Sequence, residues 1–240
     1  MHGLMNIGNT CYMNAGLQLI FSCREFREYI NRNNGELINL VKEIMNDSNN
    51  PTDFKRLFGS RHQQFRGGNQ QDSHEFLVYL LDDLIEEVSI DIFKVVYKQT
   101  YTDTVYFNDN IIQLPIVSDS LLKNIYRFFS QEEIEGKTKI LKLNKCPKCL
   151  IMSFKRFGND GNKINKDIHS PDKFNLYKYT YKLRSFVLHM GSANGGHYVA
   201  YFRNKHEWFL CNDASISKVN DISDPLNKAY ILLYERYDKK

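Results

Sequence analysis

The spacing of hydrophobic residues changes along the chain, from a helical period in the first third to strand-like patterns in the last third. The most regular stretch is 69–88, where apolar residues recur every three or four positions, as on one face of a helix. Acidic and polar residues occupy most of its other positions. The stretch therefore predicts an amphipathic helix, whose apolar positions are Phe76, Leu77, Leu80, Leu81, Leu84, Ile85 and Val88.

The first half of the chain predicts further helices. Residues 12–21 are apolar on nearly every face and contain no proline, which indicates a buried helix. Residues 23–44 keep the helical spacing but are interrupted by the polar, glycine-containing segment 33–35, which predicts two shorter helices. We expect additional helices at 53–65 and 120–129.

The last third of the chain predicts strands. Its residues alternate between apolar and polar, or form short runs of β-branched and aromatic residues. A helical first half packed on an antiparallel C-terminal sheet is an α+β fold. The strands expected there are 183–190, 197–203, 208–212 and 229–236, with turns at 191–194 and 204–205, and earlier strands are expected at 95–101, 104–107 and 150–154.

Composition restricts the classes of partner. The formal net charge of the 240 residues is +4, with both signs scattered, so we expect no nucleic-acid partner. We also expect no membrane partner, because no apolar run reaches the roughly 18 residues of a membrane span and the first residues do not look like a signal peptide. Five cysteines without the spacing of a secreted disulfide scaffold favour a reducing compartment. We therefore expect an intracellular protein, cytoplasmic and/or nuclear.

Cys11 is the first candidate for chemistry. It follows Gly8-Asn9-Thr10, a turn and cap sequence, and falls in the first turn of the helix predicted next. Exposed backbone N–H groups and the helix dipole favour an anion there, so the position is expected to lower the pKa of the thiol. The alternative is a small buried apolar residue, which position alone favours.

A second stretch supplies possible partners for this thiol. His197 follows Gly195 and Gly196 at the start of a predicted strand, and a strand that begins at Trp208 ends in Asn212 and Asp213. Cysteine proteases need a thiolate, an imidazole and a third group that orients the imidazole. The order Cys, His, Asn or Asp is that of papain-like enzymes. A plain turn at the last two residues is the alternative.

Four segments together resemble one family. They are residues 3–18 around Cys11, 70–77, 153–157, and 181–213 around His197, and they occur in the family's order. The chain closely resembles the ubiquitin-specific proteases, deubiquitinases with a papain-like core. The resemblance implies a cysteine-type ubiquitin carboxyl-terminal hydrolase, a thiol protease that cleaves after the last glycine of ubiquitin through a thioester acyl-enzyme.

The resemblance also implies roles for single residues. Cys11 would be the nucleophile, His197 the general base and acid, and Asn212 the group that orients His197, with Asp213 as the other candidate. Asn6, otherwise an ordinary polar turn residue, would donate to the oxyanion.

The remaining roles concern substrate binding. Asp72 and Glu75 would bind arginines near the ubiquitin C-terminus, although the residues alone favour a helix cap and a dipole contact. Gly195 and Gly196 would leave room for a narrow substrate tail, or form a flexible turn before a strand.

Residues 90–143 depart from the family. Relatives often carry a zinc-binding finger-like extension there, held by two Cys-x-x-Cys pairs, whereas this segment contains no cysteine. Cys146 and Cys149 form one such pair just beyond it, but structural zinc takes four ligands and the remaining cysteines form no second pair. We therefore expect no metal and no cofactor.

The expected organisation is a single catalytic domain, 1–240. It comprises a helical subdomain (1–89), a reduced finger-like insertion (90–143) and a β-rich subdomain (144–240). The expected partners are ubiquitin and ubiquitinated proteins, and the expected state is a monomer. Two alternatives remain open: a catalytically dead ubiquitin-binding module, and a protease for another ubiquitin-like modifier.

Overall fold

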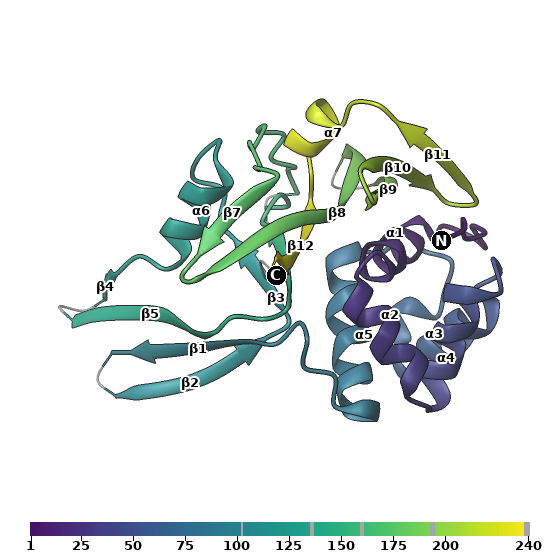
Figure 1. Cartoon of the computed structure of the whole chain (residues 1–240), viewed down its shortest axis with the longest axis horizontal. Coiled ribbons are helices and arrows are strands. Elements are labelled where there is room, and N and C mark those ends of the chain that lie inside the picture. Colours follow the sequence, from purple (N-terminus) through teal and green to yellow (C-terminus); the bar gives the residue numbers. More distant parts are fainter. Residues whose placement is uncertain (102, 135–136, 159–160, 193–194, 238–240) are drawn as a thin grey trace.

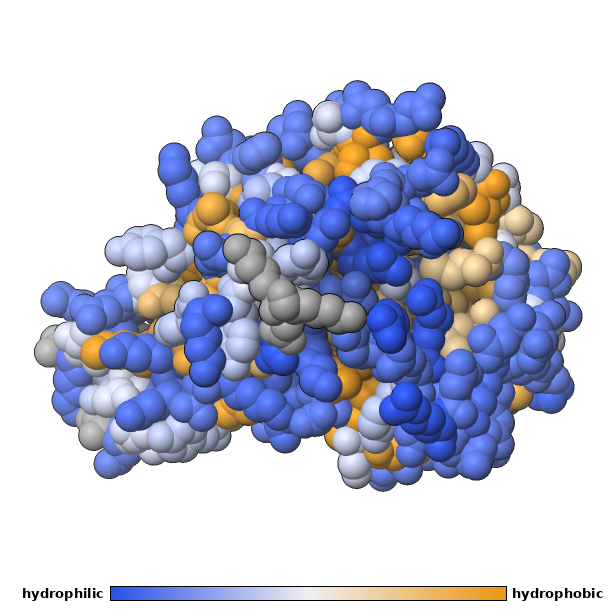
Figure 2. All heavy atoms as spheres, in the orientation of Figure 1, coloured by the Kyte–Doolittle hydropathy of each residue, from blue (hydrophilic) through white to orange (hydrophobic). Residues whose placement is uncertain are grey.

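The computed structural model describes residues 1–101, 103–134, 137–158, 161–192 and 195–237. Figure 1 shows helices α1 to α5 gathered at one side of a central sheet, while strands β1, β2, β4 and β5 extend away at the other end. Figure 2 shows a mostly hydrophilic face with hydrophobic residues exposed in scattered places. In the described part of the chain, no helix is long and apolar enough to cross a membrane.

The helical half follows the predicted spacing closely. Every residue of α1 is buried, as expected for a helix that is apolar on all faces, and the break at 33–35 separates α2 from α3. Helix α5 begins later than predicted, because Asp72 accepts hydrogen bonds from the backbone of His74 and Glu75 and so caps it. The elements are α1 (Cys11–Phe21), α2 (Arg24–Arg32), α3 (Glu36–Asn46), α4 (Thr52–Arg61), the short 3₁₀ turn η1 (Gln63–Phe65) and α5 (Ser73–Val88).

The central sheet has the order β11-β10-β9-β8-β12-β6-β3, and β7 pairs with β8. All its pairings are antiparallel except that of β6 with β3, an edge strand from the middle of the chain, which is parallel. The parallel pair arises because a long connection, rather than a hairpin, joins the two strands. The strands are β3 (Ile111–Leu114), β6 (Cys149–Phe154), β7 (Lys173–Leu176), β8 (Tyr179–Ser192), β9 (Gly195–Asn204), β10 (Glu207–Asn212), β11 (Ser215–Val219) and β12 (Ile231–Tyr237).

A second, four-stranded sheet has the order β2-β1-β5-β4 and forms the extension seen in Figure 1. Its edge strand β2 is exposed at every position. The pattern did not predict β4 or β5, because many of their residues are charged and exposed. These strands are β1 (Val95–Thr100), β2 (Thr104–Asp109), β4 (Glu132–Ile134) and β5 (Lys137–Lys145), with helices α6 (Leu121–Phe128) and α7 (Ser223–Asn227) elsewhere in the chain.

Both faces of the central sheet are buried, and the side-chain alternation divides them. In β12, Ile231 and Leu233 join the core shared with the helices, whereas Leu232 joins the core on the opposite face. Helix α1 lies against β9 and packs against α5, where a Cβ added at Gly16 would lie 3.0 Å from the Phe76 ring. The N-terminus of α1 is thereby fixed beside β9.

One predicted turn and one further loop fall partly outside the described residues. In the expected turn at 191–194, Gly191 and Ser192 continue β8, and 193–194 lie outside the described part. The polar loop that follows Phe157 likewise contains 159–160, which are outside it.

Candidate active site

Helix α1 and strands β9 and β10 meet at what we call the catalytic junction, formed by Asn6, Cys11, His197, Asn212 and Asp213. Cys11 is the first residue of α1, as predicted, and its side chain is only 4% exposed. The backbone N–H groups of Tyr198 and Tyr12 both interact with its sulfur. The thiol therefore lies beside the start of β9, next to the residue that follows His197.

The expected lowering of the Cys11 pKa is wrong for the protein without substrate. Burial raises the pKa of the thiol above its ordinary value, and the negative charge of Asp213 raises it further. Backbone N–H groups lower the pKa, but the largest single contribution comes from Tyr198 on β9 rather than from Tyr12 or Cys11 at the helix terminus, and the effect of burial is larger still. Strand β9 buries the thiol, and the sequence around Cys11 contains no sign of that contact.

His197 and Asn212 are joined by a hydrogen bond. The Nε2 atom of His197 lies 2.7 Å from Oδ1 of Asn212, at the end of β10. An amide oxygen only accepts hydrogen bonds, so Nε2 carries the hydrogen in this contact. The second ring nitrogen, Nδ1, is then unprotonated in the neutral imidazole and can accept a proton.

Asp213 is oriented differently from Asn212. Its backbone is left-handed, with φ of 49°, directly after the end of β10. Its carboxylate accepts hydrogen bonds from Nδ2 of Asn6 at 2.9 Å and from Nδ2 of Asn14 at 2.8 Å. His197 thus contacts Asn212, whereas Asn6 and Asn14 contact the next residue, Asp213.

The Asn6 side chain is fixed at both ends of its amide. Its oxygen accepts from the backbone N–H groups of Gly8 and Thr10, at 3.2 and 3.1 Å. Its Nδ2 atom donates one hydrogen to Asp213, which leaves a second N–H hydrogen for another acceptor. An oriented amide donor on the segment that leads into Cys11 is the kind of group that stabilises an oxyanion.

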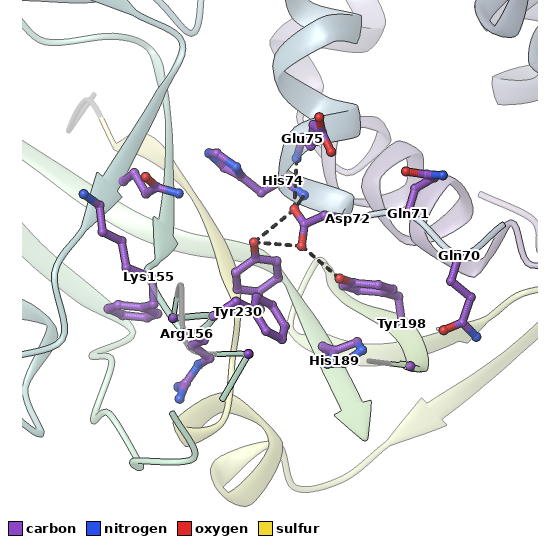
Figure 3. Close-up of a pocket in the computed structure, with 16 residues that line it drawn as sticks. Gln70, Gln71, Asp72, His74, Glu75, Lys155, Arg156, His189, Tyr198 and Tyr230 are labelled. Carbon is purple, nitrogen blue, oxygen red and sulfur yellow. Dashed lines mark hydrogen bonds between the residues drawn. The ribbon is translucent and has the colours of Figure 1, made fainter. Parts of the chain in front are cut away.

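Asp72, Glu75, Tyr198 and Tyr230 form what we call the acidic junction, where α5 meets β9 and the start of β12 (Figure 3). The Asp72 carboxylate accepts from the backbone N–H groups of His74 and Glu75, at 2.8 and 3.0 Å. It also accepts from the hydroxyls of Tyr198 and Tyr230, each at 3.0 Å. An ionised carboxylate offers about four acceptor positions, so Asp72 is close to saturated.

The Glu75 side chain, by contrast, is exposed in the first turn of α5. Partial burial and the neighbouring Asp72 charge raise the pKa of its carboxyl group. The two acids grouped by sequence therefore differ: one holds three elements together, and the other faces the surface.

A pocket of about 720 Å³ lies between this acidic junction and the loop after β6 (Figure 3). Its wall includes polar side chains from α5 and its approach, from β9 and from the segment after β6. Neither Cys11 nor His197 lines it, so it adjoins the catalytic junction rather than containing it. The lining residues most relevant here are Gln70, Asp72, Glu75, Lys155, His189, Gly195, Tyr198 and Tyr230.

The two predicted glycines differ in surroundings. Gly195 lines the pocket, whereas a Cβ added at Gly196 would lie 2.2 Å from the carbonyl oxygen of Met190. Glycine at 196 is thus required by its packing against β8. Gln70 donates to the Gly196 carbonyl and accepts from its N–H, both at 3.0 Å. These two hydrogen bonds join the segment before α5 to β9. The sequence analysis assigned no role to Gln70.

Two further side chains near the pocket were missed by sequence reasoning. Arg156 is 2% exposed and donates to the carbonyls of Ala229, Ile164 and Lys166, which fixes the loop after β6. Burial lowers the pKa of His189 to about 4, so this histidine is neutral near pH 7. The segment 153–157 was singled out as a family box, but only the fold shows which carbonyls its arginine contacts.

Comparison with known proteins gives matches over nearly the whole chain. Residues 2–234 match the family model described as ubiquitin carboxyl-terminal hydrolase. Ubiquitin carboxyl-terminal hydrolase 2 of Homo sapiens is 25% identical over 330 residues, with 97% of this chain and 54% of the relative covered. The probable ubiquitin carboxyl-terminal hydrolase 8 of Schizosaccharomyces pombe is 28% identical, with 98% of this chain and 64% of the relative covered. The chain spans little more than half the length of such relatives.

A solved structure shares the fold. A chain of the SAGA Ubp8/Sgf11/Sus1/Sgf73 DUB module bound to ubiquitin aldehyde superposes with a TM-score of 0.86 at 21% sequence identity. The match covers 100% of this chain and 70% of that chain. It confirms the predicted α+β architecture.

Proposed function

Because this chain belongs to the ubiquitin carboxyl-terminal hydrolase family, we propose that it is a thiol-dependent deubiquitinase. It would hydrolyse the isopeptide or peptide bond after the C-terminal glycine of ubiquitin. The observation that carries the proposal is the hydrogen bond between His197 and Asn212, at the strand that buries Cys11. It leaves an imidazole nitrogen free to accept a proton beside a helix-terminal thiol.

The first half of the reaction would combine attack by Cys11 with transfer of its proton to His197. Burial favours the neutral thiol, so we propose that the transfer accompanies substrate attack rather than preceding it. The sulfur adds to the carbonyl carbon, and the second N–H hydrogen of Asn6 donates to the oxyanion. Such a donor contributes about 3 kcal/mol of transition-state stabilisation. Asn212 accepts from the imidazolium and keeps it oriented.

The second half would release the two products. His197 gives its proton to the leaving amine, which departs and leaves a thioester between Cys11 and the ubiquitin carboxyl group. Water, deprotonated by His197, then attacks the thioester and regenerates the thiol. The chain's own side chains supply each proton acceptor and donor in this sequence.

Substrate binding would divide between the two acids. Glu75 is exposed, so it is the residue we propose to contact a cationic side chain near the ubiquitin C-terminus. Asp72 is already close to saturated and would act mainly by holding Tyr198 and Tyr230 in place. Gly195, at the rim of the pocket, would border the substrate tail. We propose ubiquitin and ubiquitinated proteins as partners, and a monomer as the working state.

The test is a panel of C-terminal fluorogenic substrates made from ubiquitin and from ubiquitin-like modifiers, cleaved by wild type and by Cys11→Ser. We expect cleavage of the ubiquitin substrate and none by the variant. Preferential cleavage of the substrate made from another modifier would identify that modifier, rather than ubiquitin, as the substrate. Ubiquitin binding without cleavage of any substrate would support the alternative of an inactive binding module.

A further inference from the structure

Two thiols and two carboxylates meet where α2 lies against the central sheet, away from the catalytic junction. Cys23 and Cys149 are buried, and Glu25 and Glu235 are half-buried. The four possible ligand atoms, one from each side chain, all lie within 4.8 Å of one another. We call these residues the Cys₂Glu₂ cluster. The reaction proposed above does not use any of them.

The fold brings these residues together from three separate elements. Cys23 is the N-cap residue of α2, and Glu25 lies in the first turn of that helix. Cys149 and Glu235 are direct partners across the antiparallel strands β6 and β12, so their side chains leave the same face of the sheet. The cluster therefore joins the helical half of the molecule to the sheet.

Positive groups lie beside the Glu235 carboxylate of the cluster. Glu235 accepts from the backbone N–H of Arg24 at 2.8 Å, and one of its oxygens lies 3.6 Å from Nε of Arg184. Cys23 Sγ lies 3.9 Å from Oε2 of Glu25, as a weak donor. Two thiolates and two carboxylates carry four negative charges. A divalent cation, Arg184 and the positive end of α2 offset most of that charge.

We propose that the Cys₂Glu₂ cluster is a four-coordinate zinc site that fastens α2 to strands β6 and β12. Zinc takes thiolate sulfur at about 2.3 Å and carboxylate oxygen at about 2.0–2.2 Å in tetrahedral sites. Those lengths place tetrahedral ligand atoms about 3.3–3.8 Å apart, so the cluster needs to contract by roughly 1.5 Å at most. Thiolate ligands select zinc over magnesium or calcium.

This site differs from the zinc site that the spacing of the cysteines suggested. The Cys146–Cys149 pair suggested half of a zinc site by spacing, and the absence of a second pair argued against metal. In the structure Cys149 groups with Cys23 and two glutamates, and Cys146 does not belong to the cluster. Binding would displace one proton from each thiol into solvent and would involve no oxidation. It would stabilise the fold, because unfolding separates the ligands.

The test uses a Cys11→Ala background, which removes metal binding by the catalytic thiol. Protein freed of metal under reducing conditions is titrated with Zn²⁺ against a chromophoric chelator, and with Co²⁺ as a spectroscopic probe. We expect one metal per chain, a cobalt spectrum of tetrahedral type with thiolate charge-transfer bands, and a zinc-dependent rise in Tm. The measured affinity and the spectrum do not depend on deubiquitinase activity.

Variants assign the ligands. Cys23→Ala and Cys149→Ala should each abolish stoichiometric binding. Glu25→Gln, at a half-buried position that leaves the core unchanged, should weaken zinc binding about tenfold or more while circular dichroism stays native. The matched controls are Cys146→Ala, the other member of the sequence pair, and Glu28→Gln, an acid of the same helix paired with Arg24. Both controls should bind zinc as the parent does.

Several results would overturn the proposal. One is sub-stoichiometric metal in the parent protein; another is undiminished affinity in Cys149→Ala or Glu25→Gln. Loss of binding in Cys146→Ala would assign the metal to the Cys-x-x-Cys pair instead. A chain mass lower by two hydrogens together with refusal of metal would identify a Cys23–Cys149 disulfide, and therefore a redox pair rather than a zinc site.

Discussion

The catalytic junction and the acidic junction share strand β9 but use their hydrogen bonds in opposite ways. In the catalytic junction, His197 has one bonded nitrogen and one available nitrogen, and Asn6 retains an available N–H hydrogen. In the acidic junction, four donors converge on the carboxylate of Asp72. Of two adjacent residues of β9, His197 belongs to the catalytic junction and Tyr198 belongs to the acidic junction.

This difference separates groups that react from groups that hold the structure. A group with an unused donor or acceptor can bind a substrate atom, whereas a saturated, half-buried carboxylate such as that of Asp72 resists displacement because its partners would lose their hydrogen bonds. We infer that the acidic junction keeps β9 in the register that places His197. Variants of the catalytic junction and of the bonded group Asp72, Tyr198 and Tyr230 should therefore differ in kind: turnover falls in the first, and stability falls in the second.

The largest expected effect is on turnover. Cys11→Ala and His197→Ala should each lower kcat for a ubiquitin substrate by about 10⁴-fold or more, since each removes a group that acts in the chemical step. Tyr230→Phe, in the acidic junction, should change kcat by only a few-fold. Steady-state kinetics and thermal unfolding on all three variants make the comparison. A Tyr230→Phe variant as inactive as His197→Ala would remove the distinction between the junctions.

The next effect distinguishes Asn212 from Asp213. Asn212→Ala should slow single-turnover acylation by about 10²-fold, because the imidazole loses the acceptor that orients it. Asp213→Ala should slow acylation by releasing Asn6, so its effect should not add to that of Asn6→Ala. Ubiquitin affinity, measured separately on a Cys11→Ala background, should change little. If Asn212→Ala acylates at the wild-type rate while Asp213→Ala is inert, Asp213 is the third catalytic residue.

The sequence predicted the elements with strong local patterns. The stripe from Phe76 to Val88 specified α5, and the all-apolar segment after Cys11 specified α1. Strand β5 was missed because its pattern is dominated by exposed charged side chains. Strand β2 was predicted although it is exposed at every position, because its residues are β-branched and aromatic.

Features of the site that depend on distant residues were less predictable. The family resemblance supplied Cys11, His197 and Asn212 as a set, but not the burial that raises the pKa of Cys11. Tyr230 and Gln70 had no marked role in the sequence, because their partners Asp72 and Gly196 lie far along the chain. Cys23 and Cys149 meet only through the packing of α2 on the sheet.

The third prediction sharpens the contrast between the two acids. Asp72→Ala should lower the free energy of unfolding by about 2–5 kcal/mol, because α5 loses its cap and two buried tyrosine hydroxyls lose their acceptor. Glu75→Gln should leave stability within about 0.5 kcal/mol, as at most exposed positions. It should raise KM for ubiquitin substrates about two- to fivefold, as expected for an exposed ion pair. Denaturant unfolding and KM measurements on both variants decide this; equal stability of the two would contradict it.

The smallest expected effect concerns the pH dependence of Cys11. Burial and the Asp213 charge both raise the pKa of the thiol, so alkylation by a small neutral reagent should reach its midpoint above pH 9.0, the ordinary thiol value. Asp213→Asn removes the charge but keeps the size of the side chain, so the midpoint should move to lower pH. Mass-spectrometric alkylation rates across pH measure it. An upward shift in Asp213→Asn would contradict this electrostatic account.

The most direct test of the central claim is covalent labelling with ubiquitin that carries a C-terminal electrophile, read by intact-mass and peptide mass spectrometry. The account predicts one adduct per chain, located on Cys11, absent from Cys11→Ala and strongly slowed in His197→Ala. Cys23, Cys146, Cys149 and Cys211 should remain unlabelled. An adduct that persists in Cys11→Ala, or one located on another cysteine of the wild-type protein, would contradict the assignment of Cys11 as the nucleophile.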